Sequence, residues 1–304
     1  FGHTKQQVLF DVSAEVKKGT CLGILGESGS GKSTMGRVLC GLLKPDSGTV
    51  FLNGVSVYGS KQGRKNLQDR LSIVFQDYTT SANPRFRVAD ILKEGLFVRQ
   101  RRERKKLNQE KEIRRLLELV GLSYDFAGRF PHELSGGQLQ RICIARAVAC
   151  NPELILFDEA ISSLDAHTQV QIMDLLLDLK EKLGLTYIFI THDLSVVNHF
   201  ADEIAVMYLG QLIEKAPTEE LFDHPVHPYT RALLSAIPIP EVGIERPERI
   251  LLRGEISSPI DPPDECRFAK RCNYVCDQCH KSCPQLVEIS EGHFVSCHLW
   301  ENFK

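Results

Sequence analysis

The sequence predicts an α/β protein built on a mainly parallel sheet, followed by a small cysteine-rich unit. Compact apolar runs alternate with segments whose apolar residues recur at helical spacing, which is typical of strands joined by crossover helices. Two runs, Leu154–Phe157 and Tyr187–Ile190, are apolar throughout, as expected of parallel strands covered on both faces. Six of the ten cysteines fall between Cys266 and Cys297, so we expect a distinct unit there.

The remaining elements are predicted in chain order from apolar patterning and turn residues. Further strands are expected at Val8–Val16, Thr20–Leu25, Thr49–Leu52 and Leu71–Phe75. The dipeptide Asn53-Gly54 is a turn signal. Helices are expected at Lys32–Leu43, Leu139–Ala149 and Ala166–Leu183.

A helical and highly charged segment runs from Val88 to about Val120. It includes the basic run Arg99–Lys106, which we interpret as a solvated helix face because no aromatic or glycine residues interleave with it. The formal net charge of −2 gives no overall field that would favour nucleic acid or anionic lipid. No apolar stretch reaches membrane-spanning length, and the start resembles no signal peptide, so we expect a cytosolic protein. The missing initiator Met suggests that the true N-terminus is absent.

A glycine-rich loop at Gly26–Ser33 lies between a predicted strand and a predicted helix. Its glycines let successive backbone N–H groups turn toward phosphates, and the helix N-terminus adds its positive dipole end. Lys32 should reach the β and γ phosphates of ATP, and the Ser33 hydroxyl should bind Mg²⁺. The alternative is a glycine-rich turn without a ligand, which the strand–loop–helix context disfavours.

Two acids follow the apolar run that ends at Phe157. A strand that ends in Asp158 and Glu159 delivers both carboxylates to the C-terminal edge of the sheet, where such proteins bind ligands. Asp158 would hold Mg²⁺ through water, and Glu159 would polarise an attacking water.

A second Ser/Gly nest, Leu134–Gln138, opens the helix that carries Gln140, Arg141 and Arg146. It is a second anion-binding surface at a helix N-terminus. Because one nucleotide does not need two such nests on one chain, the redundancy indicates a dimer.

With these motifs in place, residues 1 to about 230 resemble the nucleotide-binding domain of ABC transporters, with a helical subdomain at about 88–150. Leu134–Gln138 matches the family signature, which meets the ATP bound to the opposite subunit. Gln76 matches the Q-loop glutamine, Ser163-Leu164-Asp165 matches the D-loop, and His192 matches the switch histidine.

The resemblance implies a set of site residues. The catalytic residues would be Lys32, Glu159 and His192, and the Mg²⁺ site would comprise Ser33, Gln76 and Asp158. Other nucleotide contacts would come from Gly26, Ser28, Gly29, Gly31, Thr34, Ser135, Gly136, Gly137, Gln138 and Asp165. The chain departs from the family where Ala160 replaces the usual proline, and the residue that stacks on adenine would be Phe1 or His3.

The cysteines divide into two groups. Cys21, Cys40, Cys143 and Cys150 lie in apolar segments and are expected to be small core residues. Four others offer soft thiolates that suit an iron–sulfur cluster or zinc, and their spacing does not decide between them: Cys266, Cys272, Cys279 and Cys297. Unligated thiols are a further alternative, while disulfides are disfavoured in a reducing cytosol.

The tail also resembles a known extension. The segment Cys266–Cys272 resembles the C-terminal region of oligopeptide/dipeptide-permease ATPases, and the segment His227–Leu234 resembles their linker. Some of those proteins carry a four-iron four-sulfur cluster on the four matching cysteines, so we expect such a cluster here, with Cys276 and Cys283 spare. A structural or oxygen-sensing role is expected for it. The implied boundaries are 1–230 for the ATP-binding domain and 231–304 for the extension.

Together these features predict the ATP-hydrolysing subunit of an ABC importer of the dipeptide, oligopeptide and nickel permease family. The resemblance implies a second ABC ATPase subunit, two transmembrane permease subunits, an extracytoplasmic substrate-binding protein, and a peripheral location on the cytoplasmic face of the membrane. Peptide is the expected cargo, with a nickel or metal-chelate importer as the alternative. A soluble ABC protein of DNA repair or ribosomes, and a non-hydrolysing regulatory chain, are less well supported, since the chain lacks coiled-coil insertions and keeps Glu159 and His192.

Overall fold

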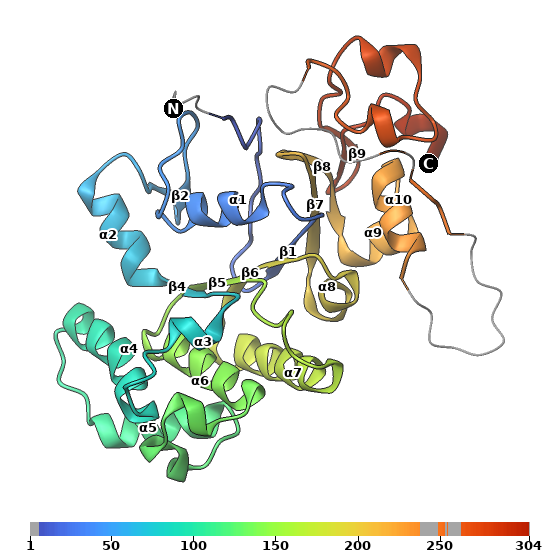
Figure 1. Cartoon of the computed structure of the whole chain (residues 1–304). Coiled ribbons are helices and arrows are strands. Elements are labelled where there is room, and N and C mark those ends of the chain that lie inside the picture. The colour runs from blue at the N-terminus through green and yellow to red at the C-terminus, as the bar shows by residue number, and fades with distance from the viewer. Residues whose placement is uncertain (1–5, 238–248, 253, 255–262, 304) are drawn as a thin grey trace, which may run out of the picture. The chain divides into compact units, whose positions relative to one another are not determined.

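The computed structural model describes residues 6–237, 249–252, 254 and 263–303 (Figure 1). The chain forms two compact units. The first comprises residues 1–15, 22–35 and 191–304, and the second comprises 16–21 and 36–190. Within the described ranges, no helix has both the length and the apolar character that crossing a bilayer requires.

Three parallel strands form the sheet of the second unit. They are β4 (Leu71–Val74), β5 (Leu154–Asp158) and β6 (Thr186–Thr191), with β5 in the middle. The ring of Phe157 stacks on Phe189 with centroids 5.4 Å apart. The completely buried centre of β5 and the burial of every residue of β6 confirm the prediction of strands covered on both faces.

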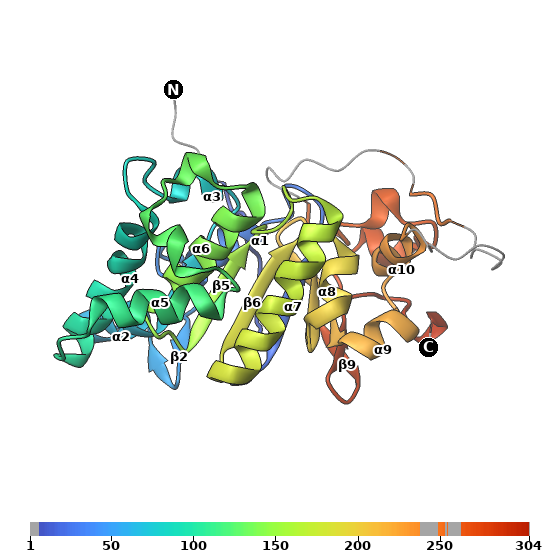
Figure 2. The same cartoon turned by 90° about the horizontal axis from the view of Figure 1, so that it is seen from below.

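The helices of the second unit and a short hairpin surround these strands. The elements are β2 (Phe51–Leu52), β3 (Val55–Ser56), α2 (Lys61–Arg70), α3 (Tyr78–Ser81), α4 (Val88–Glu103), α5 (Gln109–Leu119), α6 (Gly136–Ala149) and α7 (Ala166–Leu183), with 3₁₀ turns η1 (Tyr124–Gly128) and η2 (Pro131–Glu133). Helices α4, α5 and α6 lie together as a helical group (Figures 1 and 2). Helices α4 and α5 lie within the segment predicted to be helical, from Val88 to about Val120, and α6 contains the predicted helix Leu139–Ala149.

The charged helical segment is interrupted, because Arg104 adopts a left-handed conformation with φ 51° and Asn108 caps α5. Part of its basic run is not simply solvated. Arg99 is only 20% exposed and forms ion pairs with Glu103 and Glu112, 3.1 and 3.0 Å long. Arg102 is likewise 20% exposed and donates to Asn151 O. The expectation of a solvated face therefore holds for residues 104–106 but is wrong for Arg99 and Arg102, and the charge of Arg99 ties α4 to α5.

The predicted turn at Asn53-Gly54 is confirmed, whereas the predicted end of the first helix is wrong. Asn53 and Gly54 have φ values of 51° and 75° and join β2 to β3, as expected of a tight hairpin turn. Helix α1 (Lys32–Leu39) ends four residues before the predicted end at Leu43. Gly41, with φ 73°, lets Leu42 N–H donate to Arg37 O and its own N–H donate to Val38 O, which satisfies the last carbonyls.

The described residues of the first unit form five strands. β1 (Cys21–Leu25) runs parallel to β7 (Glu203–Tyr208), and β8 (Gln211–Pro217), β10 (His293–Val295) and β9 (Val287–Ser290) follow in antiparallel order. Its helices are α8 (Leu194–Phe200), α9 (Thr218–Asp223) and α10 (Pro228–Ser235), with 3₁₀ turns η3 (Ala269–Arg271), η4 (Asp277–His280) and η5 (Trp300–Phe303). The cysteine-rich tail thus extends the sheet of this unit through β9 and β10 (Figure 1).

The predicted strand at Val8–Val16 is wrong, since residues 6–16 contain no strand. Phe10 N–H instead donates to Gly210 O, 2.9 Å away, in a single loop contact. The guanidinium of Arg267 covers the Phe10 ring, 3.7 Å from its centroid, so this aromatic side chain packs against the tail.

Buried aromatic side chains form the core beneath the tail. Phe268, 2% exposed, packs against Tyr208 and Tyr229 with centroid distances of 5.3 and 5.5 Å. Tyr208 and Tyr229 are themselves 4.9 Å apart. This aromatic cluster (Tyr208, Tyr229 and Phe268) joins β7, α10 and the cysteine-rich tail in one core.

Candidate nucleotide site

The loop Gly26–Ser33 curls around the ammonium of Lys32. Lys32 is 4% exposed, and its Nζ donates to the carbonyl oxygens of Gly26 (2.7 Å) and Glu27 (2.9 Å). Gly29 and Gly31 adopt φ values of 79° and 100°, which favour glycine. These conformations close the loop over the start of α1.

Close packing explains the glycine at position 26. A Cβ atom there would lie 2.4 Å from Met207 O and 2.7 Å from Ser30 Oγ. The hydroxyl of Ser30 is buried and has no hydrogen-bond partner. A buried hydroxyl without a partner costs free energy unless a ligand satisfies it, so the loop is suited to a polar group such as a phosphate. Ser28 and Gly29 face solvent at the tip.

Asp158 ends β5, and Glu159 follows it in a strained conformation. The φ of Glu159 is 48°, in the left-handed region that costs a residue with a side chain on the order of 1 kcal/mol or more. Its N–H donates to Ile190 O (2.9 Å), and its Oε2 accepts from Gln76 Nε2 (3.2 Å). The second unit therefore brings Gln76 and Glu159 together. Ala160 is fully buried in the place where the family usually has proline.

The nest Leu134–Gln138 forms the N-terminus of α6. Ser135 caps the helix: its Oγ accepts from Gln138 N–H (3.3 Å), and Gln138 Oε1 accepts from Ser135 N–H (3.0 Å). This reciprocal pair keeps the first turn ordered. Ser135 and Gly136 remain exposed at the helix start, where another molecule can reach them.

Asp165 caps α7 beside this nest. Its carboxylate accepts from Thr168 N–H (3.0 Å) and Thr168 Oγ1 (2.7 Å), and these bonds lower the pKa of Asp165. Thr168 also touches α6, because a Cβ on Gly137 would lie 2.6 Å from Thr168 Cγ2. The signature and the D-loop therefore meet within the second unit.

The predicted site residues are divided between the two units. The loop Gly26–Ser33, Thr34 and His192 belong to the first, and His192 is exposed just after β6. The second contains Gln76, Asp158, Glu159, Asp165 and the nest Ser135–Gln138. Their convergence on one nucleotide stays a prediction. Phe1 and His3, the candidates for stacking on adenine, lie outside the described residues.

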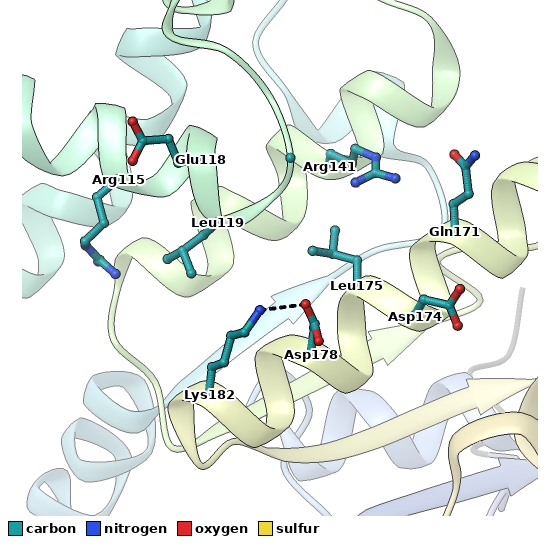
Figure 3. A pocket seen from close by; sticks show the side chains of 10 residues that line it. Arg115, Glu118, Leu119, Arg141, Gln171, Asp174, Leu175, Asp178 and Lys182 are labelled. Atoms are coloured by element: carbon teal, nitrogen blue, oxygen red, sulfur yellow. Dashed lines mark hydrogen bonds and ion pairs between the residues drawn. The ribbon is translucent and has the colours of Figure 1, made fainter.

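A hollow of about 700 Å³ lies between α5, α6 and α7 (Figure 3). Arg115, Arg141 and Lys182 border it together with acidic residues such as Asp174 and Asp178, and Lys182 pairs with Asp178 at 2.7 Å. This mixture of charges does not favour a polyanion such as ATP. None of the predicted nucleotide contacts lines it.

The scattered cysteines are mostly core residues, as predicted. Cys21, Cys40 and Cys143 are buried, while Cys150 is only half-buried. Burial, with a smaller contribution from the charge of Asp158, raises the pKa of the Cys40 thiol to about 12. Cys40 is therefore a neutral thiol.

The tail thiols raise one another's pKa values. Burial raises the pKa of Cys266 to about 12 and that of Cys297 to about 11, with further contributions from neighbouring tail thiols, including Cys272 and Cys279. The sulfurs of Cys272 and Cys297 accept backbone N–H bonds, both 3.4 Å long. Cys276 Sγ lies 3.6 Å from Cys279 Sγ. Nevertheless, in the described part of the chain no three such side chains stand in an arrangement that would hold a metal ion.

Sequence reasoning missed an ion pair between the phosphate-binding loop and the tail. Arg271 donates from both terminal nitrogens to the carboxylate of Glu27, at 2.8 and 3.1 Å. The side chains of Arg271 and Glu27 are 10% and 27% exposed. Hydrogen bonding to Glu27 raises the pKa of Arg271 above its usual value. A variable position of the loop pattern gave no signal of this contact.

A second missed feature is the buried Glu214 on β8. Its carboxylate accepts from Val226 N–H (2.7 Å) and His227 N–H (3.1 Å) and lies 3.0 Å from His293 Nε2. Burial alone would lower the pKa of His293, but Glu214 and, to a smaller degree, Glu220 outweigh it and raise the pKa. Through these contacts His293 ties β10 of the tail to β8 and α9.

Comparisons with known proteins identify two regions of the chain. Residues 9–162 match the family model described as ABC transporter, and residues 213–279 match that of the oligopeptide/dipeptide transporter C-terminal region. The chain is 46% identical to the oligopeptide transport ATP-binding protein AppF of Bacillus subtilis (strain 168), over 95% of this chain and 88% of that protein. It is 42% identical to the dipeptide transport ATP-binding protein DppF of Haemophilus influenzae, over 96% and 89%.

A solved structure gives the same fold. The ATP-binding cassette MJ0796, in a dimeric post-hydrolysis state bound to ADP and Pi, matches with a TM-score of 0.63 and 30% identity. The match covers 72% of this chain and 94% of that one. The predicted fold class is thereby confirmed for the nucleotide-binding part.

Proposed function

Because this chain belongs to the ABC transporter family, as an ATP-binding protein with an ATPase domain, we propose that it energises an importer of peptides. The observation that carries the ATPase assignment is the glycine-rich loop, with Lys32 curled inside it and the partnerless Ser30 hydroxyl beneath it. The match of residues 213–279 to the oligopeptide/dipeptide transporter region supports peptide as the cargo.

Each predicted site residue takes a role in this proposal. The backbone of Gly26–Ser33, with Thr34, would cradle the phosphates, and Lys32 would offset the charge on them. Ser33, Gln76 and Asp158 would hold Mg²⁺, which neutralises phosphate charge when bound. Glu159 would accept a proton from the attacking water, and His192 would contact the terminal phosphate.

Two chains would complete two sites. The exposed Ser135 and Gly136, with Gly137, Gln138 and Asp165, would face the ATP held by the loop of a partner subunit. The dimeric state of the related cassette supports this arrangement. Transmembrane permease subunits would convert closure of the pair into transport. A substrate-binding protein would deliver peptide, and the chain would sit on the cytoplasmic face of the membrane.

A substitution at Glu159 tests the hydrolytic role. Glu159→Gln should lower ATP turnover by at least about 10²-fold while ATP binding persists, because the amide cannot accept the proton. Glu181→Gln, an exposed change near the end of α7, is the matched control and should leave turnover unchanged. Near-normal turnover by the Glu159 variant would remove this residue as the base.

Purification of the chain from native membranes tests the transport role. Permease subunits should co-purify, and vesicles containing the complex should take up labelled oligopeptide when supplied with ATP. Uptake of nickel instead of peptide would identify the alternative cargo. A ribosome- or DNA-bound complex without membrane subunits would contradict the transport role.

We also propose that Cys266, Cys272, Cys279 and Cys297 hold a four-iron four-sulfur cluster. The backbone N–H bonds to the sulfurs of Cys272 and Cys297 support this proposal, since hydrogen bonds to the ligating sulfurs tune the potential of such clusters. Anaerobically purified chain should contain iron and absorb broadly in the visible range. A protein that contains zinc but no iron would favour a zinc site. If the protein contained no iron and no zinc, the thiols would be unligated.

A further inference from the structure

The ion pair between Arg271 and Glu27 joins two parts of the chain that have different chemistry. Glu27 follows the first glycine of the phosphate-binding loop, and Arg271 lies directly before Cys272 in the tail. The two side chains meet as a parallel fork, the strongest geometry available to an arginine and a carboxylate. The contact therefore fixes the direction of the Glu27 carboxylate as well as neutralising it.

Other groups hold this fork in place. Arg271 Nη1 lies 3.4 Å from Tyr208 Oη, and the Tyr229 hydroxyl accepts from the N–H of Glu27 at 3.2 Å. Tyr208 and Tyr229 belong to the aromatic cluster, which Phe268 of the tail completes. Helix α10 thus holds the backbone N–H of Glu27, and the tail holds the Glu27 side chain.

A carboxylate in a phosphate-binding loop is unfavourable for binding a polyanion. Backbone N–H groups and Lys32 attract the phosphates, whereas an uncompensated charge on Glu27 would repel them, and like charges at short range weaken binding. Arg271 removes that repulsion, because it neutralises the carboxylate and holds it against the tail.

We propose that Arg271 is a positioning residue for nucleotide binding, which acts through Glu27 and makes the tail part of the ATP site. This inference rests on the proposed function, since it assumes that the loop binds ATP. Loss of Arg271 should weaken ATP binding by about tenfold, within the range typical of coupling between two sites. Turnover at saturating ATP should change less than about twofold, because Arg271 contacts Glu27 and Tyr208 and has no assigned role in the hydrolytic step.

The experiment measures the Kd of Mg-ATP in the presence of the Glu159→Gln change, together with KM and kcat in the otherwise unchanged chain. Arg271→Gln should raise Kd and KM about tenfold. Lys270→Gln, which removes the same charge from an exposed neighbouring residue, is the matched control and should leave both within about twofold. Arg271→Lys should give an intermediate Kd, since it keeps the charge but loses the fork.

A second substitution distinguishes charge compensation from general damage to the tail. Glu27→Gln removes the repelling charge, so the Glu27→Gln/Arg271→Gln double variant should recover a Kd within about threefold of the unchanged chain. Glu27→Gln alone should also bind within about threefold. Trp300, the single tryptophan, lies in the tail, so its fluorescence shows whether the tail remains folded.

Several results would overturn the inference. One is an Arg271→Gln variant that binds ATP within twofold of the unchanged chain, and another is a double variant that binds as weakly as Arg271→Gln with Trp300 fluorescence intact. A tenfold loss in Glu27→Gln alone would have the same consequence, even if Arg271→Gln failed to fold. Failure of the unchanged chain to bind ATP would instead contradict the proposed function.

Discussion

Replacement of Phe268 by alanine should detach the cysteine-rich tail from its core. Phe268 is 2% exposed and packs edge-on against the rings of Tyr208 and Tyr229. Truncation of a fully buried phenylalanine typically costs about 3–5 kcal/mol, through lost transfer free energy and the cavity left behind. We expect a loss of about 4 kcal/mol in the free energy of unfolding of the first unit.

Urea unfolding followed by the fluorescence of Trp300 measures this loss where it occurs, because the only tryptophan lies in the tail. With a denaturant dependence of about 2 kcal/mol per molar urea, the midpoint should fall by about 2 M. Tyr274→Ala is the control: Tyr274 is an aromatic residue of the same tail, but it is 44% exposed. Its midpoint should fall by no more than about 0.5 M.

A Phe268→Ala midpoint within 0.5 M of that of the unchanged chain would refute the reasoning. It would mean that the aromatic cluster does not determine how firmly the tail is held. A large fall in the Tyr274→Ala midpoint would be equally damaging, since the tail would then be sensitive to any aromatic deletion.

Two further predictions concern the signature and the buried histidine. Gly137→Ala should lower ATPase activity about tenfold or more, because the added Cβ would lie 2.6 Å from Thr168 Cγ2. Adding Thr168→Ser to this variant should raise the activity again several-fold, because serine lacks the clashing methyl group but keeps the hydroxyl that donates to Asp165. A double variant no more active than Gly137→Ala would exclude this clash as the cause. Because Glu214 and Glu220 raise the pKa of His293 above 6.5, the stability that His293 adds should be fully present below about pH 6.5 and fall as pH rises through the raised value. The urea midpoint of the unchanged chain minus that of His293→Gln, followed at Trp300, should therefore shrink with rising pH, and a difference that grew would contradict the assignment.

The sequence was most informative where one local signal determined one local structure. The cap of Ser135 and Gln138 follows from the residue types and their spacing of three. The parallel strands β5 and β6 follow from their continuous apolar character. Asn53-Gly54 gives its turn because both residues tolerate a positive φ.

Features that depend on distant neighbours were not predictable in this way. The apolar residues of Val8–Val16 look like a strand, but this segment joins Gly210 by one backbone bond and no ladder. The end of α1 was misplaced because Gly41 stops the helix before the proline that follows it. The buried carboxyl group of Glu214 contacts His293, which lies 79 positions further along the chain. No local sequence pattern predicts a contact between two residues so far apart in the chain.

The fork between Glu27 and Arg271 spans 244 positions of the chain. A ribosome therefore makes the phosphate-binding loop long before it makes Arg271. During that interval, a growing chain presents a loop whose carboxylate has no arginine to hold it. On the proposed role of Arg271, high affinity for ATP is acquired only after Arg271 has been made and folded against the loop.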